Sequence, residues 1–508
     1  MSEAKYKGYS SLNYIAFNYA GFACISIVVF LTATQPFYIK EVIGIEPILG
    51  HIKDSKIGHI IGGLGFFDEL ISMISAPLLG TLNDKLNTLG YGGSKLIQSS
   101  SLLVLAIALF GYAIINSHLI PDMFIFRGIF ALGVTGCMSM ITVVLNELSY
   151  SDFTFGKLLF WKQSDYQAIS LNGNDIEVNV KRNGKYSAIM GIATGLGAIF
   201  SVSAFVTLPV KFQDWYPEID MKWSLRYSYL VVMGFAILSA LFLYAFLYQA
   251  DSKVQQEESR EENKPYFEIL KDGFEFSKTN KQAQLAYVGA FAARSTTVAT
   301  SIFIPLMVYD WYYNIGECEN GSGDWAGKMT CYEGYIFSAI LTGVAQTVAL
   351  ISAPLWGYLI DNSKIGKFRT LAISSLVGAV GNFGLSLINT SFNHYDPKTI
   401  VCFLFVSIIG LSQIGLIISS MSILSGISNA HQIMGSLSGF YSFCGGIGIM
   451  MITLVGGILA DHWIVGPFFL LGLFNLTSLG VYLTFVKENN KVISIGDDSE
   501  VENTNETA

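Results

Sequence analysis

The chain contains 508 residues, of which 52% are hydrophobic and 13% are charged, and its mean hydropathy is +0.49. This much apolar surface cannot all be packed into soluble cores, so the composition excludes an ordinary soluble protein and indicates a membrane protein. The net charge of −8 says little about topology, because acidic residues weigh lightly there.

Apolar segments long enough to cross a bilayer recur along the whole chain, since a span needs about 20 mostly apolar residues. Twelve can be placed, near residues 14–38, 57–82, 96–115, 123–145, 186–209, 226–249, 284–311, 333–360, 370–388, 399–425, 434–460 and 465–486. The sequence therefore predicts an all-α membrane protein with twelve transmembrane helices. No small-residue cleavage pattern follows the first segment, so we interpret it as a span and not as a signal peptide.

Lysine and arginine residues predict the orientation of these spans. With both termini in the cytoplasm, 20 of these residues fall in cytoplasmic segments, 8 in outer segments and 2 within spans, which accounts for all 30. We therefore expect an integral membrane protein with both termini in the cytoplasm.

Two adjacent acids, Asp68 and Glu69, lie near the middle of the second span in "GGLGFFDELISM". An ionised group at that depth costs at least ~2.5 kcal/mol, so such residues are expected to be paired or used. Arg127 in the fourth span and Arg294 in the seventh bring the count within spans to two acids and two bases. Mutual pairing between acids and bases is therefore one interpretation of these four residues.

One ten-residue phrase occurs twice in the chain. "SAPLLGTLND" at residues 75–84 returns as "SAPLWGYLID" at residues 352–361, with seven of ten positions identical. The copies close the second and the eighth span, so the two halves are related by a shift of six helices. Gly184 likewise has a counterpart in Gly435. We expect an N-terminal six-helix bundle (1–249), a charged cytoplasmic linker (250–283), a C-terminal six-helix bundle (284–486) and an acidic cytoplasmic tail (487–508).

The repeat also distinguishes between the two acids of the second span. A shift of 277 residues aligns Asp68 with Ala345 and Glu69 with Gln346, so only position 69 keeps a polar group in both halves. Adjacent helix positions point about 100° apart, so only one of the two acids is expected to face a central cavity. The alignment favours Glu69.

The longest outer loop, between spans seven and eight, carries two cysteines. Cys318 and Cys331 share this loop, where a disulfide can persist, although two free thiols remain the alternative. Asn320 in the same loop and Asn389 in a later outer loop fit the glycosylation acceptor pattern. These features indicate a secretory-pathway membrane, either the plasma membrane or that of a vacuole-like organelle.

The repeated phrase resembles the signature of the major facilitator superfamily, Gly-x-x-x-Asp-[Arg/Lys]-x-Gly-[Arg/Lys]-[Arg/Lys]. The first copy reads Gly80 to Asp84 and Lys85, and the second reads Gly357 to Asp361. In both copies the second glycine and the basic residues of the signature lie further along the chain than the signature places them. The resemblance covers nearly the whole chain. It implies two six-helix bundles that rock around a midplane site, and a latch at the cytoplasmic mouth formed by Gly80, Asp84, Lys85, Glu147, Gly357, Asp361, Lys367 and Arg369, with Lys85 and Glu147 as a matching pair.

The resemblance also implies which side chains line the path, because spans one, four, seven and ten do so in this family. With Gln346 added as the repeat counterpart of Glu69, the candidates are Asn18, Thr34, Gln35, Arg127, Arg294, Thr296, Thr297, Gln346 and Gln413. Two arginines at one cavity would suit an anionic solute. The same arginines would also serve as counter-ions to Asp68 and Glu69, and the sequence does not separate these interpretations.

The main hypothesis is a proton-coupled secondary transporter for a small polar or anionic solute. Arginine stays charged at any relevant pH, whereas a buried carboxyl group can gain and release a proton, so Asp68 or Glu69 would carry the protons, with Glu69 favoured. The alternatives are an uncoupled facilitator and a non-transporting sensor that signals through residues 150–185 and 250–284. No P-loop, HExxH or CxxC motif occurs. We therefore expect no enzyme activity, cofactor, metal or nucleic-acid partner, and the sequence indicates no oligomeric state.

Overall fold

The computed structural model describes residues 6, 8–44, 56–115, 118–153, 183–249, 264–315, 332–387 and 396–505. Within these ranges the regular structure is helical, and one bridge pairs Tyr6 with Ser151. Twelve of the described helical segments are long and apolar enough to cross a membrane. The prediction of an all-α protein with twelve transmembrane helices is confirmed.

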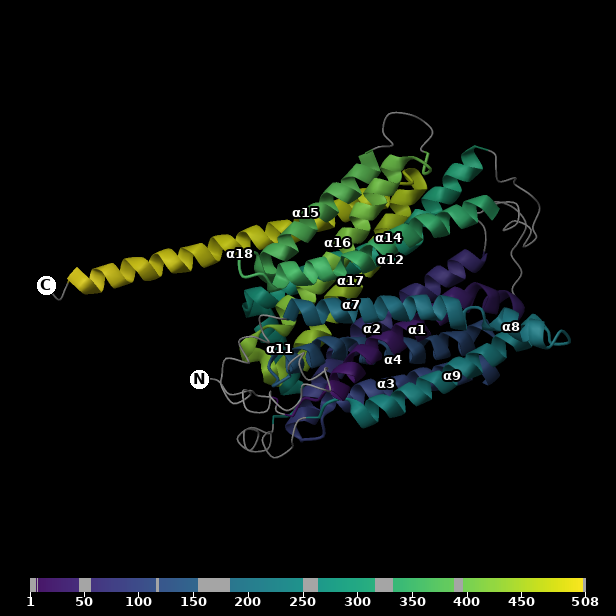
Figure 1. The fold of residues 1–508 in the computed structure, drawn as a ribbon, viewed down its shortest axis with the longest axis horizontal. Coiled ribbons are helices and arrows are strands. Elements are labelled where there is room, and N and C mark those ends of the chain that lie inside the picture. The colour runs from purple at the N-terminus through teal and green to yellow at the C-terminus, as the bar shows by residue number, and fades with distance from the viewer. Residues whose placement is uncertain are drawn as a thin grey trace, which may run out of the picture.

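Six long helices form the N-terminal half, drawn from purple to teal in Figure 1. They are α1 (Ser11–Glu41), α2 (Lys56–Thr88), α3 (Gly93–Phe110), α4 (Phe124–Ser149), α7 (Asn183–Phe200) and α9 (Met221–Phe246). A short helix, α8 (Leu208–Trp215), follows α7 after a π-helical turn. The six predicted spans of this half therefore correspond to six helices.

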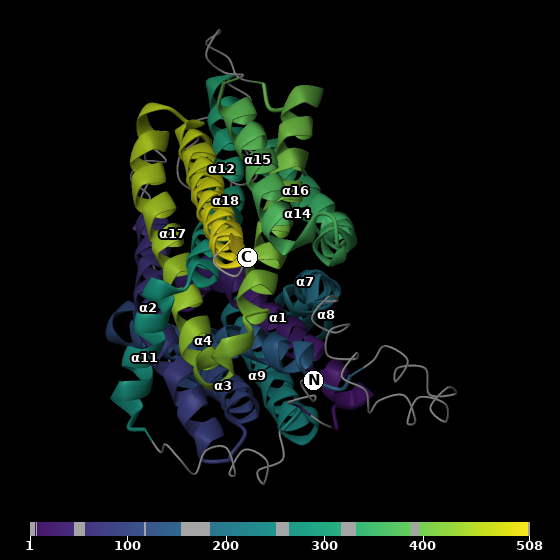
Figure 2. The same cartoon turned by 90° about the vertical axis from the view of Figure 1, so that its left-hand side faces the viewer.

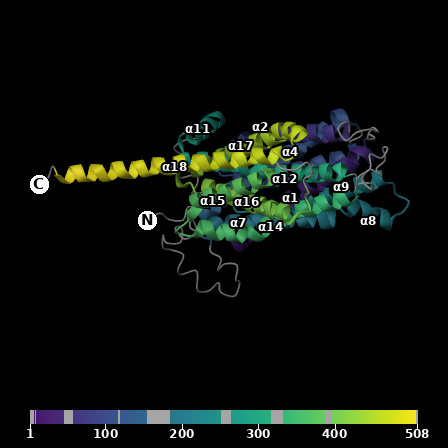
Figure 3. The ribbon, with the colours of Figure 1, turned by 90° about the horizontal axis from the view of Figure 1, so that it is seen from above.

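The C-terminal half also has six long helices, drawn from green to yellow on the other side of the molecule (Figure 1). They are α12 (Lys281–Asn314), α14 (Tyr332–Asp361), α15 (Gly366–Leu387), α16 (Ile400–Ser425), α17 (Met434–His462) and α18 (Gly466–Asn505). The short helix α11 (Tyr266–Thr279) lies between the halves in sequence. Because α18 continues to Asn505, most of the segment predicted as a tail extends the last helix, which projects beyond the others in Figure 3.

The apolar residues of α2 show how these helices are divided between surface and interior. Leu70, Ile74, Leu78 and Leu82 are exposed and lie four residues apart, so they form one stripe along the helix. No membrane is present in the structure, but such an apolar stripe is what a lipid-facing helix surface requires. Asp84 is buried on another face.

The interior of the N-terminal half is aromatic. The rings of Tyr112 and Tyr229 stack with centroids 5.4 Å apart, and Phe30 and Tyr38 of α1 pack against Tyr229 at 4.9 and 5.3 Å. The Tyr38 hydroxyl donates a 2.6 Å hydrogen bond to the Tyr112 carbonyl oxygen, which satisfies a buried polar group. This packing joins α1 and α9 to the π-helical turn that follows α3.

The two halves meet mainly through two helix pairs, α2 with α17 and α7 with α14 (Figure 2). Gly80 of α2 faces Gly435 of α17, and Gly357 of α14 faces Gly184 of α7, each so closely that a Cβ atom would meet backbone atoms of the other helix. Small residues permit such close approach of helix backbones. Each half of the molecule therefore contributes one glycine to each of the two crossings.

One end of the molecule carries α11, and we call it the α11 end. There α2, α4, α14 and α16 end, while α7 and α17 begin. The Tyr266 hydroxyl of α11 donates to the Leu78 carbonyl oxygen of α2 at 2.8 Å, and the rings of Phe274 and Phe440 lie 5.6 Å apart. These contacts hold α11 against α2 and α17.

Candidate functional site

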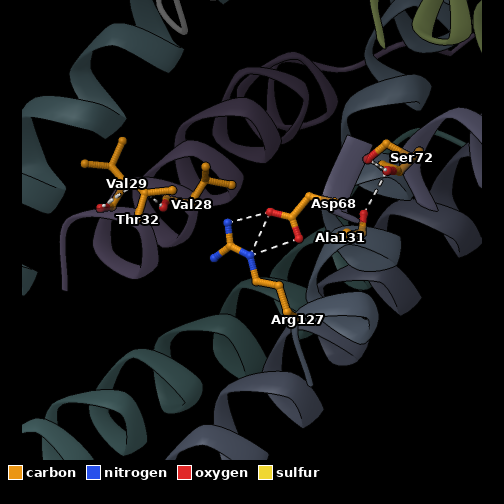
Figure 4. A network of polar contacts seen from close by, with 8 residues as sticks. Val28, Val29, Thr32, Asp68, Ser72, Arg127 and Ala131 are labelled. Atoms are coloured by element: carbon orange, nitrogen blue, oxygen red, sulfur yellow. Dashed lines mark hydrogen bonds and ion pairs between the residues drawn. The ribbon is translucent and has the colours of Figure 1, made fainter. Parts of the chain in front are cut away.

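The two adjacent acids of α2 have different surroundings. The Nε of Arg127 donates to both carboxylate oxygens of Asp68 at 2.9 and 2.7 Å, and its Nη2 lies 2.5 Å from Oδ2 (Figure 4). The side chains of Asp68 and Arg127 are only 18% and 7% exposed. Asp68 is therefore engaged in an ion pair within the N-terminal half.

The ion pair depends on the close approach of α4 to α2. Gly128 follows Arg127, and a Cβ atom at Gly128 would lie 2.9 Å from Ile71 and 3.3 Å from Phe67. The absence of a side chain thus lets the start of α4 come near the turn of α2 that carries Asp68. Arg127 Nη1 is buried without a hydrogen-bond partner among the described residues.

Glu69 faces a central cavity of about 360 Å³. The wall combines residues of α1, α2, α4 and α7 from one half with residues of α12, α16 and α17 from the other. Its polar side chains are Glu69, Ser72, Thr135, Thr142, Ser187, Thr194, Arg294, Thr297, Tyr441 and Ser442. The remaining wall is apolar, apart from Gly191. The cavity therefore lies between the two halves.

Glu69 and Arg294 contribute one acid and one base to this wall, from opposite halves. The Glu69 carboxylate makes no hydrogen bond or ion pair with any described residue. The polar contact of the Arg294 guanidinium is a long one, from Nη2 to the Ser442 hydroxyl at 3.5 Å. Both charged groups are thus available to a molecule inside the cavity.

A glycine pair on α17 makes room for both charged side chains. A Cβ atom at Gly445 would clash with the Arg294 side chain, and one at Gly446 would lie 3.3 Å from Glu69 Oε2 and 2.6 Å from Met73. Gly445 and Gly446, near the middle of α17, therefore have a steric role at the site.

Few of the other predicted cavity residues lie at the cavity wall. Arg294 and Thr297 do, and Arg127 instead pairs with Asp68. The hydroxyls of Thr34 and Thr296 donate to carbonyl oxygens one turn earlier in their own helices, as Asn18 does through its amide. The structure places the remaining three elsewhere: Gln35 is buried off the wall, Gln346 is exposed on α14, and Gln413 lies 3.5 Å from the Thr300 hydroxyl.

Several polar residues of the cavity wall were not predicted from the sequence. Ser72 lies three positions after Glu69, so it shares a face of α2 with it, and its hydroxyl accepts a 2.9 Å hydrogen bond from Thr135 of α4 (Figure 4). Tyr441 and Ser442 lie one turn before the α17 glycines that face the cavity. Helical spacing from Glu69 and from Gly445 would have found these three residues.

The aspartates of the repeated phrase bind helix N-termini across the two halves. Asp84 of α2 accepts hydrogen bonds from the backbone N–H groups of Gly435 and Ser436 and from the Ser436 hydroxyl, each at 2.7 Å. Asp361 of α14 accepts from the N–H groups of Gly184 and Lys185 at 2.8 and 3.0 Å. Helix N-termini favour carboxylates because their N–H groups are unpaired and the helix dipole is positive there.

The other predicted latch residues make different contacts from those expected. An ion pair between Lys85 and Glu147 is not formed, although both lie in the described part of the chain: Lys85 donates to the Lys264 carbonyl oxygen at 2.8 Å, and Glu147 accepts from the Ser94 hydroxyl at 3.0 Å. The expected pair was wrong because the backbone just before α11 and the start of α3 supply the partners of Lys85 and Glu147. Lys367 donates to the Gly426 carbonyl oxygen at 3.4 Å, and Arg369 to that of Lys364 at 2.9 Å.

The C-terminus of α16 receives donors from the N-terminal half. Asn146 donates to the Ser425 carbonyl oxygen at 2.6 Å, and Asn183 donates to that of Ser422 at 3.0 Å and to the Ser425 hydroxyl at 2.8 Å. Nearby, His431 Nδ1 lies 3.0 Å from Asn146 Oδ1. Together with the two aspartate caps, these contacts join the halves at the α11 end of the cavity.

Four predicted sites in the outer loops fall outside the described residues. They are the proposed disulfide partners Cys318 and Cys331 and the glycosylation acceptors Asn320 and Asn389.

Two six-helix halves around a central cavity are the architecture of a membrane transporter. Residues 178–453 match the family model described as Major Facilitator Superfamily. The chain belongs to the major facilitator superfamily, and the resemblance read from its repeated phrase is confirmed. It is an integral membrane protein.

A curated relative is the magnetosome protein MamH of Paramagnetospirillum magneticum, which is 20% identical over 445 residues, covering 87% of this chain and 85% of MamH.

Solved structures of similar fold include two proton symporters. The proton:xylose symporter XylE matches with a TM-score of 0.60 at 12% identity, over 94% of this chain and 97% of XylE. The Escherichia coli fucose:proton symporter FucP has a TM-score of 0.56 at 16% identity, over 93% and 97%. The human organic anion transporter MFSD10 has a TM-score of 0.55 at 11% identity, over 93% and 99%. At these identities the matches establish the fold alone.

Proposed function

We propose that the protein is a proton-coupled secondary transporter that moves a small polar or anionic solute, with Glu69 as the proton carrier. The observation that carries this proposal is the Glu69 carboxylate, which faces the cavity between the halves with no described hydrogen bond or ion pair. A carboxyl group in that position can exchange a proton with whichever side the cavity opens to. Asp68 is held by Arg127 and is therefore the less suitable carrier.

Alternating access follows from the symmetry of the two crossings. Each Asp cap and each facing glycine pair joins helices of different halves at the α11 end, so breaking these contacts would open the cavity on that side. We propose that the α11 end is cytoplasmic, because the lysine and arginine count of the sequence favours that orientation. The state described here is then the one closed to the cytoplasm.

Two of the similar structures are titled as proton symporters, which supports the coupling, whereas their solutes are sugars and that of MFSD10 is an organic anion. These solutes differ, and the identities are too low to transfer any of them. The solute class must come from this chain's own cavity.

The test is uptake of labelled solutes into vesicles that contain the purified protein, with and without an imposed pH gradient. We expect the wild type to accumulate a solute only with the gradient. Glu69→Gln should lose accumulation but keep counterflow exchange, because it can bind solute without cycling a proton. Glu218→Gln, which changes an exposed acid in a loop, is the control and should accumulate like the wild type.

Three outcomes would contradict the proposal in different ways. Equilibration of a solute that ignores the pH gradient in both proteins would indicate an uncoupled facilitator. Solute binding without any flux would indicate the sensor. Gradient-driven accumulation that survives in Glu69→Gln would retain the coupling but remove Glu69 from its role.

A further inference from the structure

We infer that the solute is a small organic monoanion with an apolar body, and that each anion crosses together with one proton on Glu69 and no net charge. This inference rests on the proposed function, which leaves the solute class and the stoichiometry open. It is drawn from the charges, the free hydrogen-bonding capacity and the size of the cavity.

The charge balance of the cavity is the first step. Among the described residues that line it, Glu69 and Arg294 are the charged ones, so the empty cavity holds one negative and one positive group. The nearby Asp68 and Arg127 neutralise each other and add nothing to this balance. An uncompensated charge in a membrane interior is costly, so loaded states that remain neutral are favoured.

A monoanion and a proton keep the cavity neutral together. When a proton from the open side binds the Glu69 carboxylate, the Arg294 guanidinium is left without a counter-charge. A carboxylate or sulfonate can then accept two parallel N–H···O bonds from that guanidinium. No covalent bond forms or breaks, and both proton and anion leave when the other side opens. An anion that entered without a proton would leave the loaded cavity with a net negative charge.

The polar groups of the wall do not suit a polyhydroxyl solute. Ser187, Thr194 and Thr297 donate their hydroxyl hydrogens to carbonyl oxygens of their own helices, Thr135 bonds the Ser72 hydroxyl, and Thr142 bonds the Ser438 hydroxyl. A sugar needs many partners that are free to donate and accept, because an unmatched polar group costs affinity in a closed site. The Tyr441 hydroxyl bonds that of Ser420, so the wall offers few free partners beyond Glu69, Arg294 and Ser442.

The rest of the wall suits an apolar body. Its apolar residues come from both halves: Ile25, Val28, Val134, Met138, Ile141, Met190, Ala293, Val298, Ile417, Met421 and Ile449. Flexible methionines fill irregular gaps and adapt to different apolar shapes. A volume of about 360 Å³ is at the small end of ligand cavities, which run from roughly 300 to 1,000 Å³. The solute is therefore expected to be small.

The groups around Glu69 leave it as the titrating acid of the cavity. Arg294 of α12 and Tyr441 of α17 share the wall with it, and Arg127 of α4 is bound to Asp68. The described wall residues of α1, α7 and α16 have no titratable side chain. The helices α3 and α11 contact α2 near Asp84, away from Glu69. The charged side chains of Lys264 and Asp272 in that region form an ion pair with each other.

The experiment is titration calorimetry of the purified full chain with unbranched and aromatic monocarboxylates and alkanesulfonates, repeated in buffers of different ionisation enthalpy. Matched amino acids, alkylammonium ions and sugars complete the panel. For a monoanion we expect one proton taken up per anion bound, and an affinity that rises up to about tenfold for each unit of falling pH while Glu69 is ionised in the free protein.

Three variants make the titration specific. Glu69→Gln should bind the anion with no proton uptake and little pH dependence. Arg294→Gln should lose about 100-fold in affinity, and Arg294→Lys, which keeps the charge but not the two parallel hydrogen bonds, should lose less. Glu147→Gln, a buried acid off the cavity wall, is the matched control and should keep a proton count of one. In vesicles, anion uptake driven by a pH gradient should not respond to an imposed potassium diffusion potential.

Binding of an amino acid with no proton uptake, or of a sugar in preference to every anion, would overturn the inference. So would anion binding with a proton count of one that persists in Glu69→Gln. These results are separable from failure of the proposed function. If uptake of an amino acid or sugar is still driven by the pH gradient, the proposed function stands without the inference. If the anion binds together with a proton but a pH gradient drives no flux, the inferred solute class is retained and the proposed proton-coupled transport is contradicted.

Discussion

At the residue scale, neighbouring acids on one turn of α2 have opposite roles because about 100° of helix rotation separates them. Asp68 is bonded to Arg127 inside the N-terminal half, while Glu69 faces the cavity opposite Arg294. The same residue type is thus structural at one position and a candidate carrier at the next. Geometry, rather than depth in the membrane, separates the two.

Removing the charge of Asp68 should destabilise the protein more than removing both charges of its pair. Asp68→Asn leaves the buried Arg127 guanidinium uncompensated, which typically costs about 3–5 kcal/mol. The double variant Asp68→Asn/Arg127→Gln should recover part of that loss. The measurement is the free energy of unfolding in mixed detergent micelles, compared in a double-mutant cycle. Equal stability of wild type and Asp68→Asn would contradict the importance of the pair.

At the element scale, the crossing of α2 and α17 is set by small residues. Gly80 and Gly435 face each other backbone to backbone, and a Cβ atom at Gly439 would lie 2.6 Å from Pro77 Cα. The crossing of α7 and α14 repeats this with Gly184 and Gly357. Close backbone contact makes each crossing sensitive to a single methyl group.

Gly80→Ala should weaken closure at the α11 end, because its new Cβ would collide with the Gly435 backbone, which cannot move aside as a side chain can. Spin labels at the exposed positions Tyr91 and Lys364, one in each half, would report the change. Double electron–electron resonance should show a larger population at long distance than in the wild type. The control is Gly343→Ala on α14, where no atom lies within 4 Å of the added Cβ, and its distances should be unchanged.

At the scale of the whole molecule, the two halves hold each other through exchanged contacts. Asp84 of the first half caps α17 of the second, and Asp361 of the second caps α7 of the first. The tip of α16 adds acceptors for Asn146 and Asn183. Closure at the α11 end is therefore distributed over separate helix pairs.

The two aspartate caps should act additively. Loss of a helix cap costs roughly 0.5–2 kcal/mol, so Asp84→Ala or Asp361→Ala alone should shift the balance of closed and open states by about 2- to 30-fold. The double variant should shift the ratio of closed to open states by the product of the two single shifts, because the caps lie on different helix pairs. The same spin-label distances measure both. A single variant that opens the molecule completely would mean that closure depends on one cap rather than two.

The sequence by itself determined the twelve spans and the two six-helix halves, and it favoured Glu69 over Asp68 as the acid at the cavity, which stays a prediction. The length of an apolar segment is a local property that the thickness of the bilayer requires. A duplicated segment also shows which residues of the two halves correspond.

Only the tertiary structure decided which partner each polar group takes. Whether Thr34 faces a cavity or its own backbone, or whether Glu147 meets Lys85 or Ser94, depends on neighbours from distant helices at separations of a few ångströms. The close pairing of Gly445 and Gly446 with Arg294 and Glu69 is likewise a property of two halves packed together. Hydrogen bonds act only at contact distance, so a pattern along one helix cannot select among partners that the fold brings to it.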